Sequence, residues 1–287
     1  MIAVYKKELK SYFINMSGYI FIAALLLFAG IFVTALNLRG RSAAFEYALS
    51  NMTLVFLFIM PILTMRSLAE ERHSRTDQLL YSLPLRVSDI VLGKFFAMLT
   101  VFLIPVAIMA VYPIILSAFG TVNFAAAYGA LLAFFLLGAA LIAICMFMSA
   151  LTESQIIAAV LSFGVLLLCY LMNGIALLIP TTAIASFVGL LICAMLFALI
   201  VWFLTRNSVV TLIAAALCVL PLSGFYYFNR PAFEGLFPDL LSTLSVFDRL
   251  NNFILGIFDV GAIVYYLSLT VFFLFLSMQS VEKRRWS

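Results

Sequence analysis

The chain has 287 residues, of which 66% are hydrophobic and 10% charged, and its mean hydropathy is +1.23. Soluble domains average about 45–50% apolar and about 25% charged residues, so this composition excludes a soluble globular domain and predicts an integral membrane protein. The net charge of +4 does not indicate a nucleic-acid partner, because the excess Lys and Arg lie next to apolar segments, as the positive-inside rule expects.

Residues 1–17 precede the first apolar segment and place apolar and basic side chains at helical spacing. The apolar ones are Ile2, Tyr5, Leu9, Tyr12 and Phe13, and the basic ones are Lys6, Lys7 and Lys10. This pattern is typical of a helix that lies in the membrane interface; a plain charged leader is the alternative. The apolar run that follows is longer than the h-region of a signal peptide, so we expect the first span to be retained.

Apolar segments of about 20 residues are needed to cross a bilayer core about 30 Å thick. About eight segments of the chain qualify: Gly18 to Leu38, Ala48 to Met65, Ile90 to Ala118, Phe124 to Leu151, Gln155 to Ile179, Ala183 to Leu204, Ser208 to Phe228 and Gly261 to Ser280. Pro61, Pro105, Pro113 and Pro221 lie in these segments and are expected to kink helices. The predicted fold is an all-α polytopic membrane protein, with residues 1–287 forming a single domain.

The basic residues predict the orientation of the spans. With an even number of spans and the N-terminus inside, twelve Lys and Arg lie on the inner side, and four lie outside: Arg39, Arg41, Arg230 and Arg249. By the positive-inside rule this distribution predicts a multi-pass protein of the plasma membrane with both termini cytoplasmic.

Residues 229–259 are too polar to cross the membrane and carry Phe and Leu at spacings of three and four. That spacing predicts short amphipathic helices at the outer surface, broken near Pro238.

Residues that could bind a metal or form a redox centre are scattered. Cys145, Cys169, Cys193 and Cys218 each lie in an apolar segment without metal-ligand spacing, and the single histidine, His73, lies in a charged stretch. Neither a metal site nor a bound cofactor is therefore predicted.

Enzymatic activity is not expected of this chain. A phosphate-binding loop needs Ser or Thr after its Gly-Lys pair, but Gly93 and Lys94 are followed by Phe95. A membrane enzyme that acts on lipid would need His, Asp, Glu or Ser clustered at one interface, and the sequence offers no such cluster. Energy for any transport must therefore come from another chain.

Residues 66–90 form a charged loop that exceeds the roughly four to six residues of an ordinary connection. From Ser67 to Ser82 it contains neither Gly nor Pro, which predicts a helix that Pro84 ends. Acids and bases are nearly balanced, which favours a protein partner over lipid headgroups. A solvated loop is the alternative interpretation.

Three stretches carry a resemblance that extends over nearly the whole chain: RSLAEERHSRTDQLLYSLPL, MFMSALTESQIIAAVLSF and LSVFDRLNNFILGIFDVGAIVYYLSLTVFFLFLSMQSVEKRRW. In this order the chain resembles the ABC-2 type permeases, especially the gliding-motility and nitrous-oxide-reductase-maturation group. It departs from their six-span plan, because Ala183 to Phe228 is expected to add a helical pair.

The resemblance implies a permease subunit without an ATPase site of its own, which works with a separate ATP-binding cassette subunit that binds ATP and Mg. The helix in the 66–90 loop would be the coupling helix. By position, the implied ATPase contacts are Arg66, Glu70, Glu71, Arg72, Thr76, Asp77, Leu79 and Leu80, with Thr152 and Glu153 in a second contact.

Further partners implied are a second copy or a related permease, the lipid bilayer, and an auxiliary membrane or extracellular protein. Export is the expected direction. The alternative function is a non-transporting membrane subunit that uses an ATPase to do mechanical work on an envelope complex.

Overall fold

The computed structural model describes residues 1–73, 86–205 and 208–285, and these residues form helices and connections without a β-strand. The chain divides into two compact units, Met1–Cys169 with Arg249–Ser287 and Tyr170–Asp248.

The first unit contains most of the helices. They are α1 (Ile2–Ile14), α2 (Ser17–Phe32), the π-helix η1 (Val33–Arg39), α3 (Phe45–Thr64), α4 (Ala69–His73), α6 (Val87–Met109), α7 (Tyr112–Ser117), α8 (Phe124–Leu151), most of α9 (Gln155–Leu178), α13 (Leu250–Ile254) and α14 (Val260–Arg285). The second unit contains the end of α9, α10 (Ala183–Thr205), α11 (Ser208–Phe228), the 3-10 helix η2 (Arg230–Phe233) and α12 (Leu236–Leu244).

The predicted all-α polytopic architecture is confirmed. Within the described ranges, seven helical stretches are long and apolar enough to cross a membrane. They correspond to seven of the predicted spans. The remaining predicted span is α10, a helix of 23 residues of which Ala183–Leu199 forms a shorter apolar stretch.

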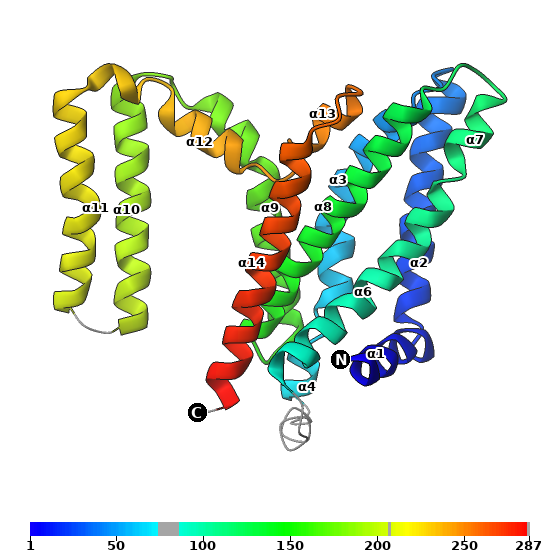
Figure 1. Cartoon of the computed structure of the whole chain (residues 1–287), viewed down its shortest axis with the longest axis horizontal. Helices are drawn as coiled ribbons and strands as arrows, with labels where there is room; N and C mark the ends of the chain where they lie inside the picture. The colour runs from blue at the N-terminus through cyan, green and yellow to red at the C-terminus, as the bar shows by residue number, and fades with distance from the viewer. Residues whose placement is uncertain (74–85, 206–207, 286–287) are drawn as a thin grey trace. The chain divides into compact units, whose positions relative to one another are not determined.

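Helix α8 is the central helix of the first unit, with α14, α3 and α6 packed around it (Figure 1). The most apolar stretch of α8 is 72% buried in the protein. The corresponding stretches of Ser17–Arg39, which contains α2, and of α14 are 22% and 28% buried. Its Phe134 ring lies 4.4 Å from that of Phe56. A methyl group at Gly138 would overlap the ring of Phe102, so the small residue allows α6 to approach α8 closely.

Both ends of the chain lie at one end of the first unit. In Figure 1, α1, α4 and the C-terminal end of α14 lie together, whereas α7 and α13 lie at the opposite end. Helix α1 runs across the end of α2, and the turn between them contains Met16 in the left-handed conformation, with a φ of 58°. This arrangement agrees with an even number of spans and with a separate helix ahead of the first one.

The proline positions correct one prediction and refine another. The expected break near Pro238 is wrong: α12 runs through it from Leu236 to Leu244, because a proline in the first turn lacks an N–H that has no partner inside the helix anyway. Pro61, Pro105 and Pro221 lie inside continuous helices. Pro113 lies in the first turn of α7, just after the break that ends α6.

The added helical pair is confirmed in the second unit. Helices α10 and α11 run side by side (Figure 1), and the rings of Phe187 and Tyr226 stack with centroids 4.4 Å apart. Phe233 packs edge-on against Tyr226 at 5.4 Å. These aromatic contacts hold η2 against the hairpin.

Candidate functional site: the α4 junction

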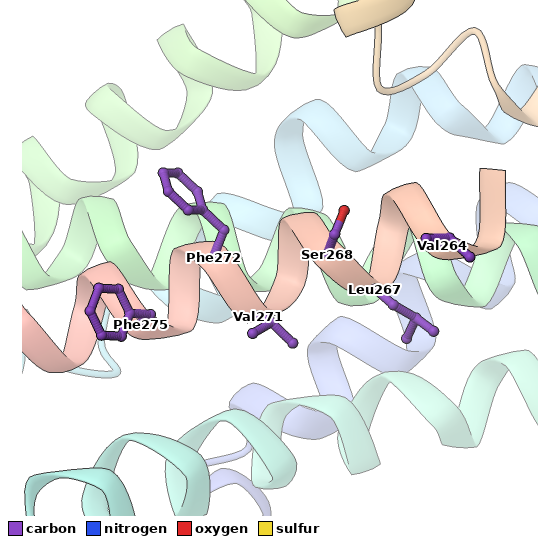
Figure 2. Close-up of a pocket in the computed structure, with 6 residues that line it drawn as sticks. All are labelled: Val264, Leu267, Ser268, Val271, Phe272 and Phe275. Atoms are coloured by element: carbon purple, nitrogen blue, oxygen red, sulfur yellow. The ribbon is translucent and has the colours of Figure 1, made fainter. Parts of the chain in front are cut away.

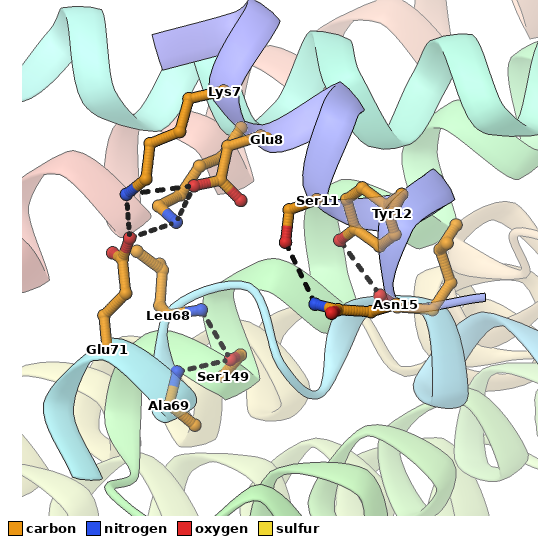
Figure 3. A network of polar contacts seen from close by, with 11 residues as sticks. Lys7, Glu8, Ser11, Tyr12, Asn15, Leu68, Ala69, Glu71 and Ser149 are labelled. Carbon is orange, nitrogen blue, oxygen red and sulfur yellow. Dashed lines mark hydrogen bonds and ion pairs between the residues drawn. The ribbon is translucent and has the colours of Figure 1, made fainter. Parts of the chain in front are cut away.

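The start of α4 is held by a side chain from α8. The backbone N–H groups of Leu68 and Ala69 donate to Ser149 Oγ at 3.3 and 3.1 Å, and this hydroxyl lies 3.3 Å from the carbonyl oxygen of Met65, to which it donates. Ser149 is fully buried. The first N–H groups of a helix lack intrahelical partners and are normally capped by a residue just ahead of it; here α8 supplies that cap (Figure 3).

The other end of α4 is held by the last turn of α8. The buried Arg72 guanidinium donates from Nη1 to the carbonyl oxygen of Ala150. Ser280 of α14 donates its hydroxyl to the same oxygen at 3.1 Å. Carbonyls at the end of a helix have no intrahelical partner and carry partial negative charge, so this one joins α4, α8 and α14.

A cluster of charges links α4 to α1 and α6. Lys94 Nζ of α6 lies 3.0 Å from Glu8 Oε1 and 2.9 Å from Glu71 Oε1. The Lys94 side chain is 2% exposed, whereas Glu8 and Glu71 are 13% and 15% exposed. Lys7 Nζ lies farther from the same two carboxylates, at 3.9 and 3.6 Å, and is 61% exposed (Figure 3). We call Lys94, Glu8 and Glu71 the Lys94 cluster.

Helix α1 is also fixed to the end of α3. The Tyr12 hydroxyl donates to the carbonyl oxygen of Leu63 at 3.2 Å. Burial, and after it the nearby Glu8 carboxylate, raises the pKa of Tyr12 above its ordinary value. The phenol therefore stays protonated and remains a hydrogen-bond donor at neutral pH.

The structure divides the predicted contact residues into inward-facing and outward-facing ones. Glu71 and Arg72 have partners inside the chain, as described above. Arg66, Glu70 and Glu153 are exposed, and Thr152 is half-buried. Thr76, Asp77, Leu79 and Leu80 lie outside the described residues, as does most of the predicted helix from Ser67 to Ser82. Contacts of all these residues with another subunit stay predictions.

Several residues of the junction were not predicted from the sequence. These are Glu8, Ser149, Ala150 and Ser280, together with Lys94, which the sequence showed only as part of a Gly-Lys pair. One usable signal was present: Lys94 is the fifth residue of the predicted span Ile90 to Ala118 and is followed by an apolar run, where an unpaired charge is unfavourable.

A pocket of about 600 Å³ runs along α14 and is lined by apolar side chains and Ser268 (Figure 2). Ser268 donates its hydroxyl to the carbonyl oxygen of Tyr265 within the same helix at 2.9 Å. A search of the described residues found no group of three His, Cys, Asp or Glu able to hold a metal. Ser268 is the only polar residue of the lining, so the lining holds no reactive constellation.

Comparison with known proteins identifies one family. A family model described as an ABC-2 family transporter protein matches residues 33–205, a range that includes α4, the end of α8 and α10. No curated protein matches the chain. Helix α1 and the segments after α10 lie outside the matched range.

Proposed function

Because the chain belongs to the ABC-2 family of transporter proteins, we propose that it is the permease subunit of an ATP-driven exporter. It forms the translocation path and couples to a separate ATP-binding subunit, which holds ATP and Mg and carries out hydrolysis. The observation that carries this proposal is the double attachment of α4 to α8, through Ser149 and Ala150.

The attachment of α4 to α8 suits a helix that transmits movement from a partner subunit to the membrane spans. A short helix of five residues, Ala69–His73, has too few internal hydrogen bonds to be stable alone. Hydrogen bonds to α8 at both ends of α4 supply that stability. Because of these bonds, a displacement of α4 would also move α8, the central helix. In this proposal, closure of the ATP-binding subunits displaces α4, and the permease changes its access state by a rigid-body movement of packed helices.

The proposed docking surface combines two segments of the sequence. Arg66, just ahead of α4, and Glu70, within α4, are exposed, and Thr152 and Glu153 follow the α8 residue that bonds to Arg72. Since Ala150 lies only two positions before Thr152, the two predicted contacts belong to one surface. Contacts of Thr76, Asp77, Leu79 and Leu80 with the ATP-binding subunit stay predictions.

The orientation follows from charge and from the position of α4. The end with α1, α4 and the C-terminus of α14 is proposed to be cytoplasmic, in the plasma membrane, since twelve of the sixteen Lys and Arg are assigned to that side. A second copy or a related permease completes the path. The gliding-motility and nitrous-oxide-reductase-maturation group remains the predicted group within the family, and an auxiliary protein a predicted partner.

Reversal of exposed charges beside α4 tests the proposal. The chain is co-expressed with an ATP-binding cassette protein from a neighbouring reading frame, and Arg66→Glu with Glu70→Arg is expected to reduce co-purification at least tenfold without lowering the amount of chain in the membrane. Arg41→Glu, an exposed arginine on the predicted outer side, is the matched control and should change nothing. Unchanged co-purification of the double variant would contradict the docking surface.

A further inference from the structure

Lys94 is the most deeply buried charged side chain of the α4 junction. It is only 2% exposed and belongs to α6, yet its two carboxylate partners come from α1 and α4. The exposed Lys7 of α1 also lies near Glu71, at 3.6 Å. The ammonium group supplied by the third helix is thus the closer and the more deeply buried of the two cations beside Glu71.

Packing alone does not explain a lysine at this position. Taking an ammonium group and two carboxylates out of water is unfavourable, and apolar residues of similar volume hold helices together equally well or better. Charged groups differ from apolar ones because a Lys94 ammonium satisfies both carboxylates only when all three helices take one arrangement. Buried ion pairs are thus suited to fixing a position.

Other contacts show that α1 is already seated on α6. A methyl group at Gly93 would come within 3.0 Å of the Val4 side chain, so the two helices lie close together. The hydroxyls of Tyr5 and Thr100 lie 3.1 Å apart, and the N-terminal ammonium lies 3.4 Å from Asp89. Helices α1 and α6 are thus packed together even without the Glu8–Lys94 ion pair. The Glu71–Lys94 ion pair joins α4 to these two helices.

We propose that Lys94 is a positioning residue for coupling: through Glu8 and Glu71 it makes α1 and α4 move as one body when the ATP-binding subunit displaces α4. The inference rests on the proposed coupling role of α4. Because α4 follows α3 directly in the chain, a movement of α4 reaches α3. Through Lys94 the same movement also reaches α1, which continues through the Met16 turn into α2. The displacement then reaches both of the first two spans.

Distance measurements between α1 and α4 test this role. Spin labels are placed at Lys10→Cys and His73→Cys, both exposed positions, in a full-length chain whose four native cysteines are replaced by alanine. The distance distribution is measured in the isolated chain and in its complex with the ATP-binding subunit, without nucleotide and after trapping with ATP and vanadate. We expect one narrow distribution in all these states.

Lys94→Met is expected to at least double the width of the distribution in the isolated chain and to make its mean differ between the nucleotide-free and trapped complexes. Lys94→Arg should keep the narrow distribution, because it preserves the charge. Lys7→Met removes the exposed ammonium beside the same carboxylates and should also keep it, since exposed pairs are weak. If Lys94 only stabilised the fold, Lys94→Met would broaden the distribution but leave its mean the same in the nucleotide-free and trapped complexes.

A second variant covers failure of Lys94→Met to insert. Glu8→Gln removes one carboxylate and leaves Lys94 paired with Glu71, and it should broaden the distribution in the same way. A distribution as narrow as that of the wild type in Lys94→Met or Glu8→Gln, or equal broadening in Lys7→Met, would overturn the role of Lys94. Failure of the wild-type chain to bind any ATP-binding subunit would instead refute the proposed function, while the isolated chain would still decide whether Lys94 links α1 to α4.

Discussion

The two ends of the first unit hold their polar groups in different ways. At the end that carries α4, bonds join residues that lie far apart in the sequence: 78 positions separate Arg72 from Ala150, 86 separate Glu8 from Lys94, and 130 separate Ala150 from Ser280. At the end that carries α13, two polar contacts span fewer positions: the Arg249 guanidinium lies 4.1 Å from the centre of the Tyr265 ring, 16 positions ahead. Asn252 donates to Asp259 across 7 positions.

The connection between η1 and α3, at the end away from α4, follows the same local pattern. The buried Asn37 amide donates to the carbonyl oxygens of Ser42 and Ala44, 5 and 7 positions ahead. Hydrogen bonds between residues close in sequence fix the conformation of a loop but not the positions of neighbouring helices. Hydrogen bonds between residues far apart in sequence fix the positions of whole helices. The comparison therefore predicts that substitutions at the α4 end will disturb helix positions and that those at the α13 end will stay local.

The largest effect is expected at the Lys94 cluster. Lys94→Leu leaves the Glu8 and Glu71 carboxylates facing each other in a mostly buried site, and removal of one partner of a buried ion pair destabilises a protein by about 3–5 kcal/mol. We expect a loss of that order in the free energy of unfolding, measured by denaturant titration in detergent. The triple variant Lys94→Leu, Glu8→Leu and Glu71→Leu should recover most of it, because well-packed apolar residues replace all three charges.

A loss below about 1 kcal/mol for Lys94→Leu, the range of exposed pairs, would place the cluster in solvent and remove the contrast between the two ends. Failure of the triple variant to recover stability would show that overpacking by leucine is also unfavourable there. Lys7→Leu, at an exposed position beside the same carboxylates, is the matched control and should cost well under about 1 kcal/mol.

The helices of this protein could be predicted well from its sequence. Helix α8 spans Phe124–Leu151 and α11 spans Ser208–Phe228, the bounds expected from the apolar runs, because backbone groups in a bilayer must be paired within a helix. Pro238 misled the prediction of the outer helices, since proline interrupts a helix interior but is tolerated in the first turn.

The contacts of the α4 junction could not be predicted in the same way. Nothing in the local sequence of α1 shows that Glu8 meets a lysine 86 positions away, because hydropathy and helical period describe one segment at a time. Arg72 was likewise predicted to face a partner, together with the rest of the charged stretch. The tertiary fold buries it against Ala150, and only the packing of α4 on α8 determines that direction.

A smaller effect is expected at Ser149. Ser149→Ala removes the acceptor for two backbone N–H groups at the start of α4, and loss of a helix cap destabilises by about 0.5–2 kcal/mol. We expect the free energy of unfolding to fall by that amount and amide hydrogen exchange to rise in α4. Ser268→Ala, whose hydroxyl bonds only within α14, is the matched control; equal exchange in α4 for both variants would contradict the capping role.

The smallest effect is expected at the α13 end, from pH. The Asn252 amide, and after it the Ala262 N–H, holds the pKa of Asp259 below its ordinary value. A lowered carboxyl pKa stabilises the folded state above the ordinary value of about 3.9, and this contribution is lost as pH falls through the lowered native value. Asp259 is only half-buried, so we expect only a local change: the Ala262 amide loses protection from exchange under acid while the unfolding midpoint stays constant. Asp259→Asn should abolish the pH dependence at Ala262, and a change in exchange that spread into α8 or α3 would show that this end, too, fixes helix positions.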